Sequence, residues 1–333
     1  MKARHNTKSG IIKQTWLTAF ILLFFMGLSL DAGAGMRTPP PERIEVIMVG
    51  DRLVDIAYHL GVLPRAMSVR GSQWEMAKKL KVSSQILGCP MYTTVKKKET
   101  IPNALKKFGI KRVMVEKSTP FCLYKPQVKP ENIAEILAGT DAVIEYVDFS
   151  AGLDAAVRQT AKLLDREAQA EALIEKYHAS LTKAQKKLPK NLGKKVLVIN
   201  GTYQKDTGKT AIRVEAPGFY SDRFFLKPTG CVNAGDAFKP AGGKAEKGYY
   251  PVRKKKNGMD LSPLIKANPD IIILTGSSYA AASSLHNYLK NNPELAKVPA
   301  IKNMAVYDLP LYVDSSVLEL PQILLQWGMA LGN

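Results

Sequence analysis

The chain has 333 residues, enough for two modest domains, and 46% of them are hydrophobic, which excludes a disordered protein. Lysine and arginine number 48 against 29 aspartate and glutamate, giving a formal net charge of +19. Such a surplus of positive charge can attract an anionic surface or ligand, but many exported proteins are basic without such a role. Because no arginine-rich arm or nucleic-acid motif occurs with it, we predict no nucleic-acid partner.

The first 34 residues have the three-part layout of a secretory signal peptide. Basic residues at positions 2, 4, 8 and 13 precede an uncharged stretch at 16–30, and Ala32-Gly33-Ala34 then supplies the small side chains that cleavage requires. An uncleaved N-terminal anchor is the alternative. No cysteine lies near the cleavage site, which argues against a lipoprotein, and no later segment is long and apolar enough to cross a bilayer. We therefore predict a periplasmic protein.

Between residues 44 and 146, short apolar runs alternate with stretches of helical periodicity. The expected strands are 44–49, 66–69, 112–115 and 142–146. The expected helices are 53–60, 74–80, 101–108 and 133–137. This alternation predicts βαβ units and a parallel sheet, which form a first lobe over residues 35–152.

Residues 153–188 interrupt this alternation because they contain helix-forming residues throughout and neither Pro nor Gly. One helix of about 35 residues would be about 50 Å long, which is more than one small domain needs. We therefore predict a single linker helix that crosses from one lobe to the other. Two helices with a kink between them are the less favoured alternative, because no helix-breaking residue is present.

The remaining residues, 189–333, predict a second α/β lobe. Its expected strands are 195–200, 270–274 and 304–309, and its expected helices are 261–267 and 316–327. The Gly- and Lys-rich segment 239–258 predicts a long loop or an insertion. The predicted fold class is α/β, with two parallel-sheet lobes joined by one long linker helix and a ligand cleft between them.

Several short motifs resemble a known family, the periplasmic substrate-binding proteins of ABC importers for iron-siderophores, haem and cobalamin. The residues that carry the resemblance are Asn268-Pro269-Asp270-Ile271-Ile272-Ile273, the run from Val298 to Tyr307, Gly230-Cys231-Val232-Asn233, and Leu163-Leu164-Asp165-Arg166-Glu167 of the linker. The resemblance covers residues 43–330. It departs from the family at Gly109-Ile110-Lys111-Arg112, where the family usually has Pro-Asp.

The resemblance implies that the ligand lies between two α/β lobes and is delivered to the permease of an ABC importer. It also implies a monomer that makes small motions, has no intrinsic cofactor and is not an enzyme. The transported ligand would be a metal chelate or tetrapyrrole, namely a ferric siderophore, haem or a corrinoid. These motifs describe the fold, so they do not identify the ligand.

Ligands of open α/β sheets bind beyond the carboxyl ends of the strands, so the loops after the predicted strands are the candidate site. Aromatic rings offer flat faces to a planar chelate or macrocycle, and arginines pair with carboxylates. For any single residue, the alternative is that the ring packs in its own lobe or the arginine faces water. The candidate ligand-binding residues are Arg52, Arg70, Trp74, Cys89, Met91, Tyr92, Cys122, Tyr124, Tyr203, Arg213, Tyr220, Tyr279 and Tyr312.

Cys89 and Cys122 fall in loops at the same predicted end of the first lobe. The two cysteines could form a disulfide, they could hold a soft metal together with Met91, or they could be unrelated thiols, in that order of preference. Cys231 lies in a predicted turn of the other lobe and is expected to be buried.

Three histidines remain after the leader, His59, His178 and His286, and all three fall on predicted helices, which argues against bare zinc or manganese as cargo. No nucleophile elbow, metalloprotease or dinucleotide motif is present. The run 201–210 imitates a phosphate-binding loop but is two residues too long. The remaining alternatives are a soft-metal binding protein with Cys and Met ligands, an exported chelatase-type enzyme of related fold, and a sensor subunit.

Overall fold

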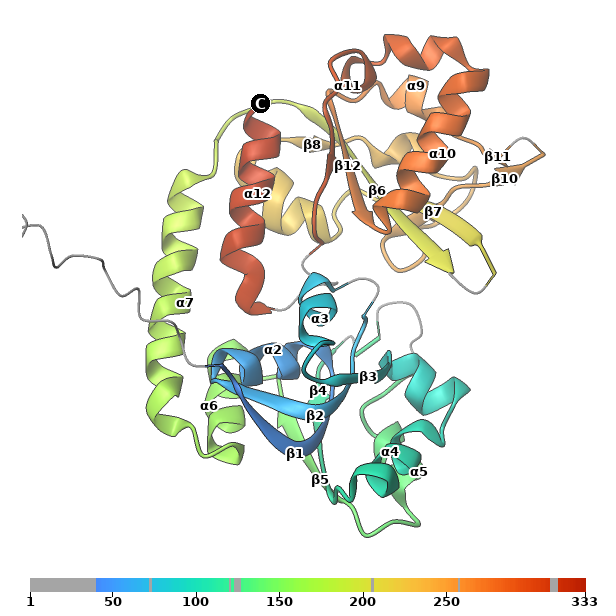
Figure 1. The fold of residues 1–333 in the computed structure, drawn as a ribbon. Helices are drawn as coiled ribbons and strands as arrows, with labels where there is room; N and C mark the ends of the chain where they lie inside the picture. Colours follow the sequence, from blue (N-terminus) through green and yellow to red (C-terminus); the bar gives the residue numbers. More distant parts are fainter. Residues whose placement is uncertain are drawn as a thin grey trace, which may run out of the picture. The chain divides into compact units, whose positions relative to one another are not determined.

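The protein is described here by a computed structural model that covers residues 40–71, 74–119, 121–122, 127–204, 207–256, 258–311 and 317–333. The predicted signal peptide lies outside these residues. Among the residues described, none of the helices combines the length and the apolar character needed to cross a membrane. Two separate sheets organise this part of the chain, together with a small two-stranded ribbon (Figure 1).

The first sheet has five strands, all parallel, in the order β3-β2-β1-β4-β5. Its strands are β1 (Glu42–Val49), β2 (Val62–Ser68), β3 (Gln85–Gly88), β4 (Arg112–Lys117) and β5 (Val143–Asp148). The helices among them are α2 (Asp51–His59), α3 (Glu75–Leu80), the π-helical turn η1 (Tyr92–Lys96), α4 (Thr100–Phe108) and α5 (Asn132–Leu137). The predicted alternation of strands and helices is confirmed, although β3 was not predicted.

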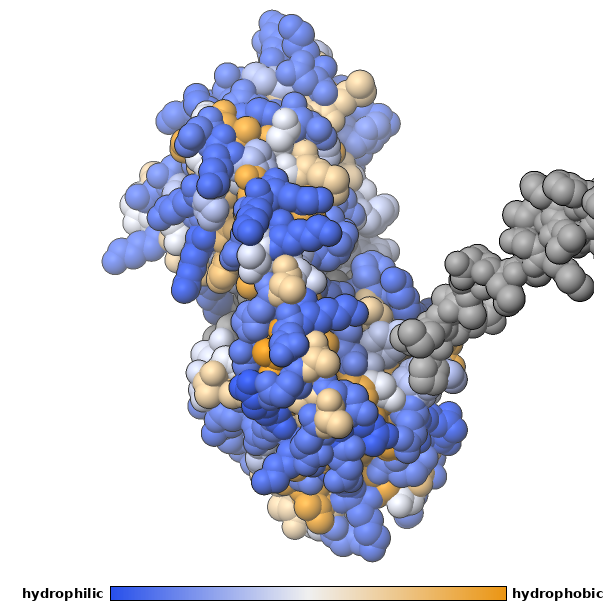
Figure 2. Space-filling view, turned by 90° about the vertical axis from the view of Figure 1, so that its left-hand side faces the viewer, coloured by the Kyte–Doolittle hydropathy of each residue, from blue (hydrophilic) through white to orange (hydrophobic). Residues whose placement is uncertain are grey.

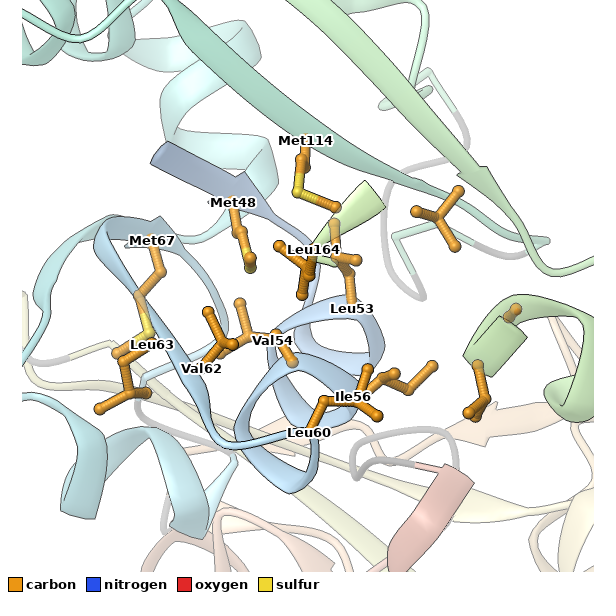
Figure 3. Packing of buried hydrophobic residues seen from close by; sticks show 14 of the residues in the cluster. Met48, Leu53, Val54, Ile56, Leu60, Val62, Leu63, Met67, Met114 and Leu164 are labelled. Atoms are coloured by element: carbon orange, nitrogen blue, oxygen red, sulfur yellow. The ribbon is translucent and has the colours of Figure 1, made fainter. Parts of the chain in front are cut away.

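Strand β1 is buried on both faces, as a central parallel strand must be. Val46 and Met48 belong to the core cluster that includes α2 and the start of the linker, whereas Ile47 and Val49 belong to the cluster under α4 and α5. Figure 3 shows the first cluster, in which Met48, Met67 and Met114 from three strands lie over Leu53 and Val54 of α2. Layers of helix therefore cover both faces of the sheet.

The linker consists of two helices, α6 (Leu153–Leu163) and α7 (Glu167–Lys187), so the prediction of one continuous helix is wrong. The break occurs at Asp165, which has a left-handed φ of 54°. Aspartate tolerates this conformation better than most residues. Arg158 on α6 donates to Glu171 on α7 through Nε (2.7 Å) and Nη2 (2.9 Å), which holds the two helices together across the turn.

The second sheet has the order β13-β12-β6-β7-β9, with β8 also paired to β6. Its strands are β6 (Lys195–Gln204), β7 (Lys209–Glu215), β8 (Val232–Asn233), β9 (Tyr249–Pro251), β12 (Ile271–Gly276) and β13 (Val306–Asp308). Strands β8, β12 and β13 run parallel to their neighbours, but β7 is antiparallel to both β6 and β9. The expectation of a purely parallel second sheet is therefore wrong, because β6 and β7 are adjacent antiparallel strands over the run that imitated a phosphate loop.

Helices cover both faces of this second sheet as well (Figure 1). They are α8 (Lys227–Thr229), α9 (Pro263–Ala267), α10 (Ser278–Asn291), α11 (Pro299–Lys302) and α12 (Leu320–Gly332), with the short turns η2 (Asp222–Leu226), η3 (Gly235–Phe238), η4 (Pro293–Lys297) and η6 (Val317–Glu319). The segment predicted as a loop contains β9 and β10 (Lys254–Lys255), which pairs with β11 (Gly258–Met259). Helix α10 was not predicted.

Candidate ligand-binding site

The carboxyl edge of the first sheet carries two ion pairs that lie inside the lobe. Arg52, at the start of α2, donates from Nη1 to Glu116 Oε1 (2.8 Å) and to Ser118 Oγ (3.0 Å), and its backbone N–H donates to Glu116 Oε2 (2.9 Å). Glu116 thereby caps the N-terminus of α2 and neutralises Arg52. Only glycine fits before this helix: Gly50 has a φ of 121°, and a Cβ there would lie 2.3 Å from Glu116 Cβ.

Arg70 follows strand β2 and is paired in the same way. Its backbone N–H donates to Asp51 Oδ1 at 2.8 Å, and its Nε contacts Asp51 Oδ2. The side chain of Arg70 is 17% exposed, against 10% for Arg52. The structure thus brings the two predicted arginines to the same sheet edge, where both are already paired with carboxylates of their own lobe.

The loop after β3 places Cys89, Met91 and Tyr92 at this edge. Cys89 and Met91 are half-buried, and Tyr92 is exposed with its ring against Gly88, whose added Cβ would lie 2.6 Å from Tyr92 Cδ1. Cys89, Cys122 and Cys231 are all free thiols, so the favoured disulfide is not formed. Burial raises the pKa of Cys89, and the nearby Cys122 raises it further, which places the two thiols in one neighbourhood. Within the described ranges, no group of three His, Cys, Asp or Glu residues could hold a metal ion.

The carboxyl edge of the second sheet presents aromatic rings instead of ion pairs. Tyr203 near the end of β6 and Tyr279 in the first turn of α10 are both exposed, and their ring centroids lie 5.2 Å apart with the planes at 71°. The N-terminus of α10 packs closely on β6, since a Cβ at Gly201 would lie 2.2 Å from the carbonyl oxygen of Ser277. That close approach brings Tyr279 beside Tyr203.

One candidate residue is buried in its lobe, and two more are half-buried and contact side chains of their own lobe. Trp74 is 1% exposed and belongs to the first core, so the prediction that its ring faces a ligand is wrong for this structure. Tyr220 packs beside Phe224 at 4.5 Å between ring centroids, against the core under α12. Arg213 donates from Nε to Asn200 Oδ1 at 3.0 Å, and its guanidinium carbon lies 3.7 Å from the ring centroid of Tyr249. Tyr124 and Tyr312 lie outside the described residues.

A pocket of about 830 Å³ lies beside Tyr279, at the carboxyl ends of β12 and β13. Its lining includes Ser277, Ser278, Tyr279, Pro310 and Leu311 from loops that sequence reasoning identified. Sequence reasoning missed its polar residues on helices, which are Glu75 and Lys78 of α3, Glu319 of η6, and Gln322 and Gln326 of α12. No sequence signal marks them, because a helix shows which of its faces is polar but not what that face meets. The volume is in the range of small-molecule sites.

The comparisons with known proteins agree with this architecture. The family model described as "Periplasmic binding protein" matches residues 131–313, more than half of the chain. The protein therefore belongs to the periplasmic binding protein family. No curated protein sequence matches the chain.

Among solved structures, the chain is similar to the periplasmic haem-binding protein BhuT in complex with two haems, with 16% identity, a TM-score of 0.59 and coverage of 87% of this chain and 98% of that one. It is similar to the periplasmic haem-binding protein HutB of Vibrio cholerae, with 17% identity, a TM-score of 0.57 and coverage of 86% and 98%. It is also similar to the triscatecholate siderophore-binding protein FeuA of Bacillus subtilis complexed with ferri-bacillibactin, with 18% identity, a TM-score of 0.54 and coverage of 89% and 94%. At these identities the similarity establishes a common fold.

Proposed function

We propose that this protein captures a metal chelate or tetrapyrrole outside the cytoplasm and delivers it to an ABC importer. One observation carries the proposal. Among the Phe, Trp and Tyr side chains in the described part of the chain, the exposed ones are Tyr92, Tyr203 and Tyr279. Tyr203 lies near the carboxyl end of β6, and Tyr92 and Tyr279 lie in the elements that directly follow β3 and β12. A single exposed ring is ordinary, but these three coincide with the sheet edges where α/β proteins bind ligands.

The chemistry of these rings suits the proposed cargo. Tyrosine offers an apolar face to a flat macrocycle and a phenolic oxygen that can ligate ferric iron in haem proteins. Two proteins of the same fold, BhuT and FeuA, have been solved in complex with haem and with ferri-bacillibactin. Both ligands are iron chelates with large aromatic surfaces, which supports this class of cargo over a bare cation.

The arginines have a narrower role in this proposal. A ligand carboxylate can reach Arg70 only by competing with Asp51, and can reach Arg52 only by competing with Glu116. Breaking a buried pair leaves an uncompensated charge, so exchange at Arg52 is disfavoured. We therefore assign ligand contact to Tyr92, Tyr203 and Tyr279 first and to the more exposed Arg70 second. Tyr124 and Tyr312, which lie outside the described residues, stay further candidates.

The rest of the proposal concerns the protein's place in the cell. We propose that residues 1–34 are a cleaved signal peptide, that 35–152 and 189–333 are the two lobes with 153–188 as linker, and that the mature periplasmic protein is a monomer which docks on a permease. We further propose that it has no enzymatic activity and no resident cofactor. A chelatase-type enzyme of related fold is the alternative, and turnover of a substrate would support it.

The test is to purify the mature protein from the periplasm, record its absorbance spectrum and metal content, and titrate the ligand-free form with haem, a ferric catecholate siderophore and cobalamin. The proposal predicts saturable binding of at least one of the three, with a visible absorbance band. A protein that is colourless and metal-free and shows no thermal shift with any of them would contradict the proposal.

A second candidate is a soft-metal binding protein that uses Cys89, Met91 and Cys122. The proximity of the two free thiols favours it. Titration with Cu(I) under reducing conditions tests it, with the Cys89→Ser/Cys122→Ser double variant as control. Metal affinity that is equal in the wild type and in this variant would exclude a site at these residues.

A further inference from the structure

The second half of α7 and the segment that follows it, up to the first residue of β6, carry charge of one sign. Residues 176–195 contain seven lysines and neither aspartate nor glutamate; the lysines are Lys176, Lys183, Lys186, Lys187, Lys190, Lys194 and Lys195. Figure 2 views the molecule from the α7 side, where hydrophilic residues dominate and hydrophobic patches lie among them. The function proposed above uses none of these lysines.

Three of these lysines border a groove of about 420 Å³ between α7, η6 and α12. Lys176, Lys183 and Lys187 lie along one wall, about 16 Å from first to last at 1.5 Å per helical residue. No acidic residue lines this groove within the chain that the structure describes. Nor does any of the three lysines form an ion pair with a residue of that part of the chain. The wall therefore presents unbalanced positive charge.

The floor of the same groove is apolar. It contains Leu173 and Tyr177, one helical turn apart on α7, Leu318 of η6, and Pro321 and Leu325 of α12. Leu173 and Leu318 pack against the core of the first lobe, whereas Tyr177 and Leu325 pack against the core under α12. An apolar floor between two helices accepts a third helix that inserts side chains at spacings of three, four and seven residues.

We propose that this lysine-walled groove is a docking site for an acidic amphipathic helix on a partner protein. Charge complementarity selects the occupant. The N-terminal leader of this chain carries Lys2, Arg4, Lys8 and Lys13 and would be repelled by the wall. A second copy of the mature chain lacks these four basic residues and Asp31, keeps a net charge of +16 (19 − 4 + 1), and is disfavoured for the same reason. A flat anionic membrane satisfies the lysines but cannot fill an apolar floor that lies below them.

This groove contains neither Tyr203 nor Tyr279, although Gln322 lines both the groove and the pocket beside Tyr279. The lining of the groove consists of residues from α2, α7, η6 and α12 and includes none of the candidate ligand-binding residues. A partner seated there would contact side chains that pack on both cores, and the binding experiment below requires no cargo. The docking proposal consequently stands or falls independently of the proposed ligand.

The experiment uses the full mature chain and a fluorescent 18-residue amphipathic peptide with leucines at helical spacing on one face and glutamates beside them. Fluorescence anisotropy measures its affinity for the wild type and for two triple variants of equal net charge. Lys176→Glu/Lys183→Glu/Lys187→Glu removes the wall, and Lys186→Glu/Lys190→Glu/Lys290→Glu reverses exposed lysines that do not line the groove. Two further peptides replace the glutamates by lysines or the leucines by serines.

The proposal predicts saturable binding of the acidic amphipathic peptide, a loss of affinity of at least tenfold in the wall variant and less than twofold in the control variant. Both altered peptides should bind at least tenfold more weakly. Equal losses in the two variants would show nonspecific charge attraction and overturn the proposal. Absence of peptide binding, or stronger wall-dependent binding to phosphatidylglycerol vesicles than to the peptide, would overturn it as well. Circular dichroism confirms that each variant is folded.

Discussion

The two sheet edges differ in how they handle polar groups. At the first, Arg52 and Arg70 are paired with Glu116 and Asp51, so charge holds the loops in place. At the second, the neutral pair Asn200 and Thr275 is joined by a hydrogen bond of 3.0 Å, and exposed tyrosine rings stand above the sheet. The comparison teaches that charged residues at a strand end do not by themselves indicate a ligand contact. The better candidates for ligand contact are the exposed tyrosines, Tyr203 and Tyr279.

The largest effect on stability is expected from replacing Glu116, because the first edge is held by its pair with Arg52. Glu116→Ala leaves Arg52 buried without its partner and removes an acceptor from the N-terminus of α2. Loss of one partner of a buried pair costs about 3–5 kcal/mol, so the free energy of unfolding should fall by that amount in urea denaturation. Asp141→Ala, which breaks an exposed pair with Lys111, is the control and should have little effect. Equal stability of the two variants would show that the first edge is not held by charge.

The second lobe contains a buried carboxyl group, that of Glu215 on β7, which is hydrogen-bonded to a serine, whereas Glu116 at the first edge is paired with an arginine. Burial raises its pKa to about 7, although Ser221 donates to it from its backbone N–H (2.5 Å) and from Oγ (2.9 Å). The folded protein keeps this proton at pH values where the unfolded chain loses it, so the group's contribution to stability is present below about pH 4.5 and is lost as the pH rises to about 7.

Glu215→Gln should therefore remove a pH dependence of about 3 kcal/mol at most over this window, at 1.36 kcal/mol per pKa unit. The measurement is the free energy of unfolding of both proteins between pH 4 and pH 8, with the exposed Glu294→Gln as control. Parallel stability curves for the wild type and Glu215→Gln would contradict a raised pKa.

The cysteines give the smallest expected effect. Because burial raises the pKa of Cys89, its thiolate is scarce at pH 8, and iodoacetamide should modify it several-fold more slowly than it modifies glutathione. Mass spectrometry of the mature protein purified without reductant should find Cys89 and Cys122 both alkylated. A peptide containing the two residues joined by a disulfide would contradict the free thiols of the first edge.

The amino-acid sequence predicted most strands of both sheets because buried parallel strands such as Ile271–Gly276 are continuous apolar runs. It failed at β3, which has four residues, and at α10, where Ser, Ala and Asn obscure the helical periodicity. It also failed at Asp165, since one left-handed residue ends a helix without Pro or Gly. Antiparallel β7 was missed because a glycine-containing polar hairpin resembles a loop.

The site was predicted less completely, for a physical reason. Strand ends identify the loops expected to reach the binding edge, and Tyr92, Tyr203 and Tyr279, which this rule selected, are exposed. Their contact with a ligand stays a prediction. Loop position does not tell whether a side chain turns inward, as Trp74 does, or pairs with a carboxylate from a distant strand, as Arg52 does across 64 residues. Such contacts depend on tertiary packing, which local sequence patterns do not contain.

The central claim is that the exposed tyrosines of the second edge hold the cargo. The most direct measurement is the dissociation constant of the ligand bound by the wild type, compared with that of Tyr203→Ala/Tyr279→Ala and of the control Val82→Ala, an exposed residue before β3 at the opposite end of the first sheet. We predict at least a tenfold weaker affinity for the tyrosine variant, about 1.4 kcal/mol or more, and an unchanged value for the control. Equal affinities in all three proteins would contradict the claim.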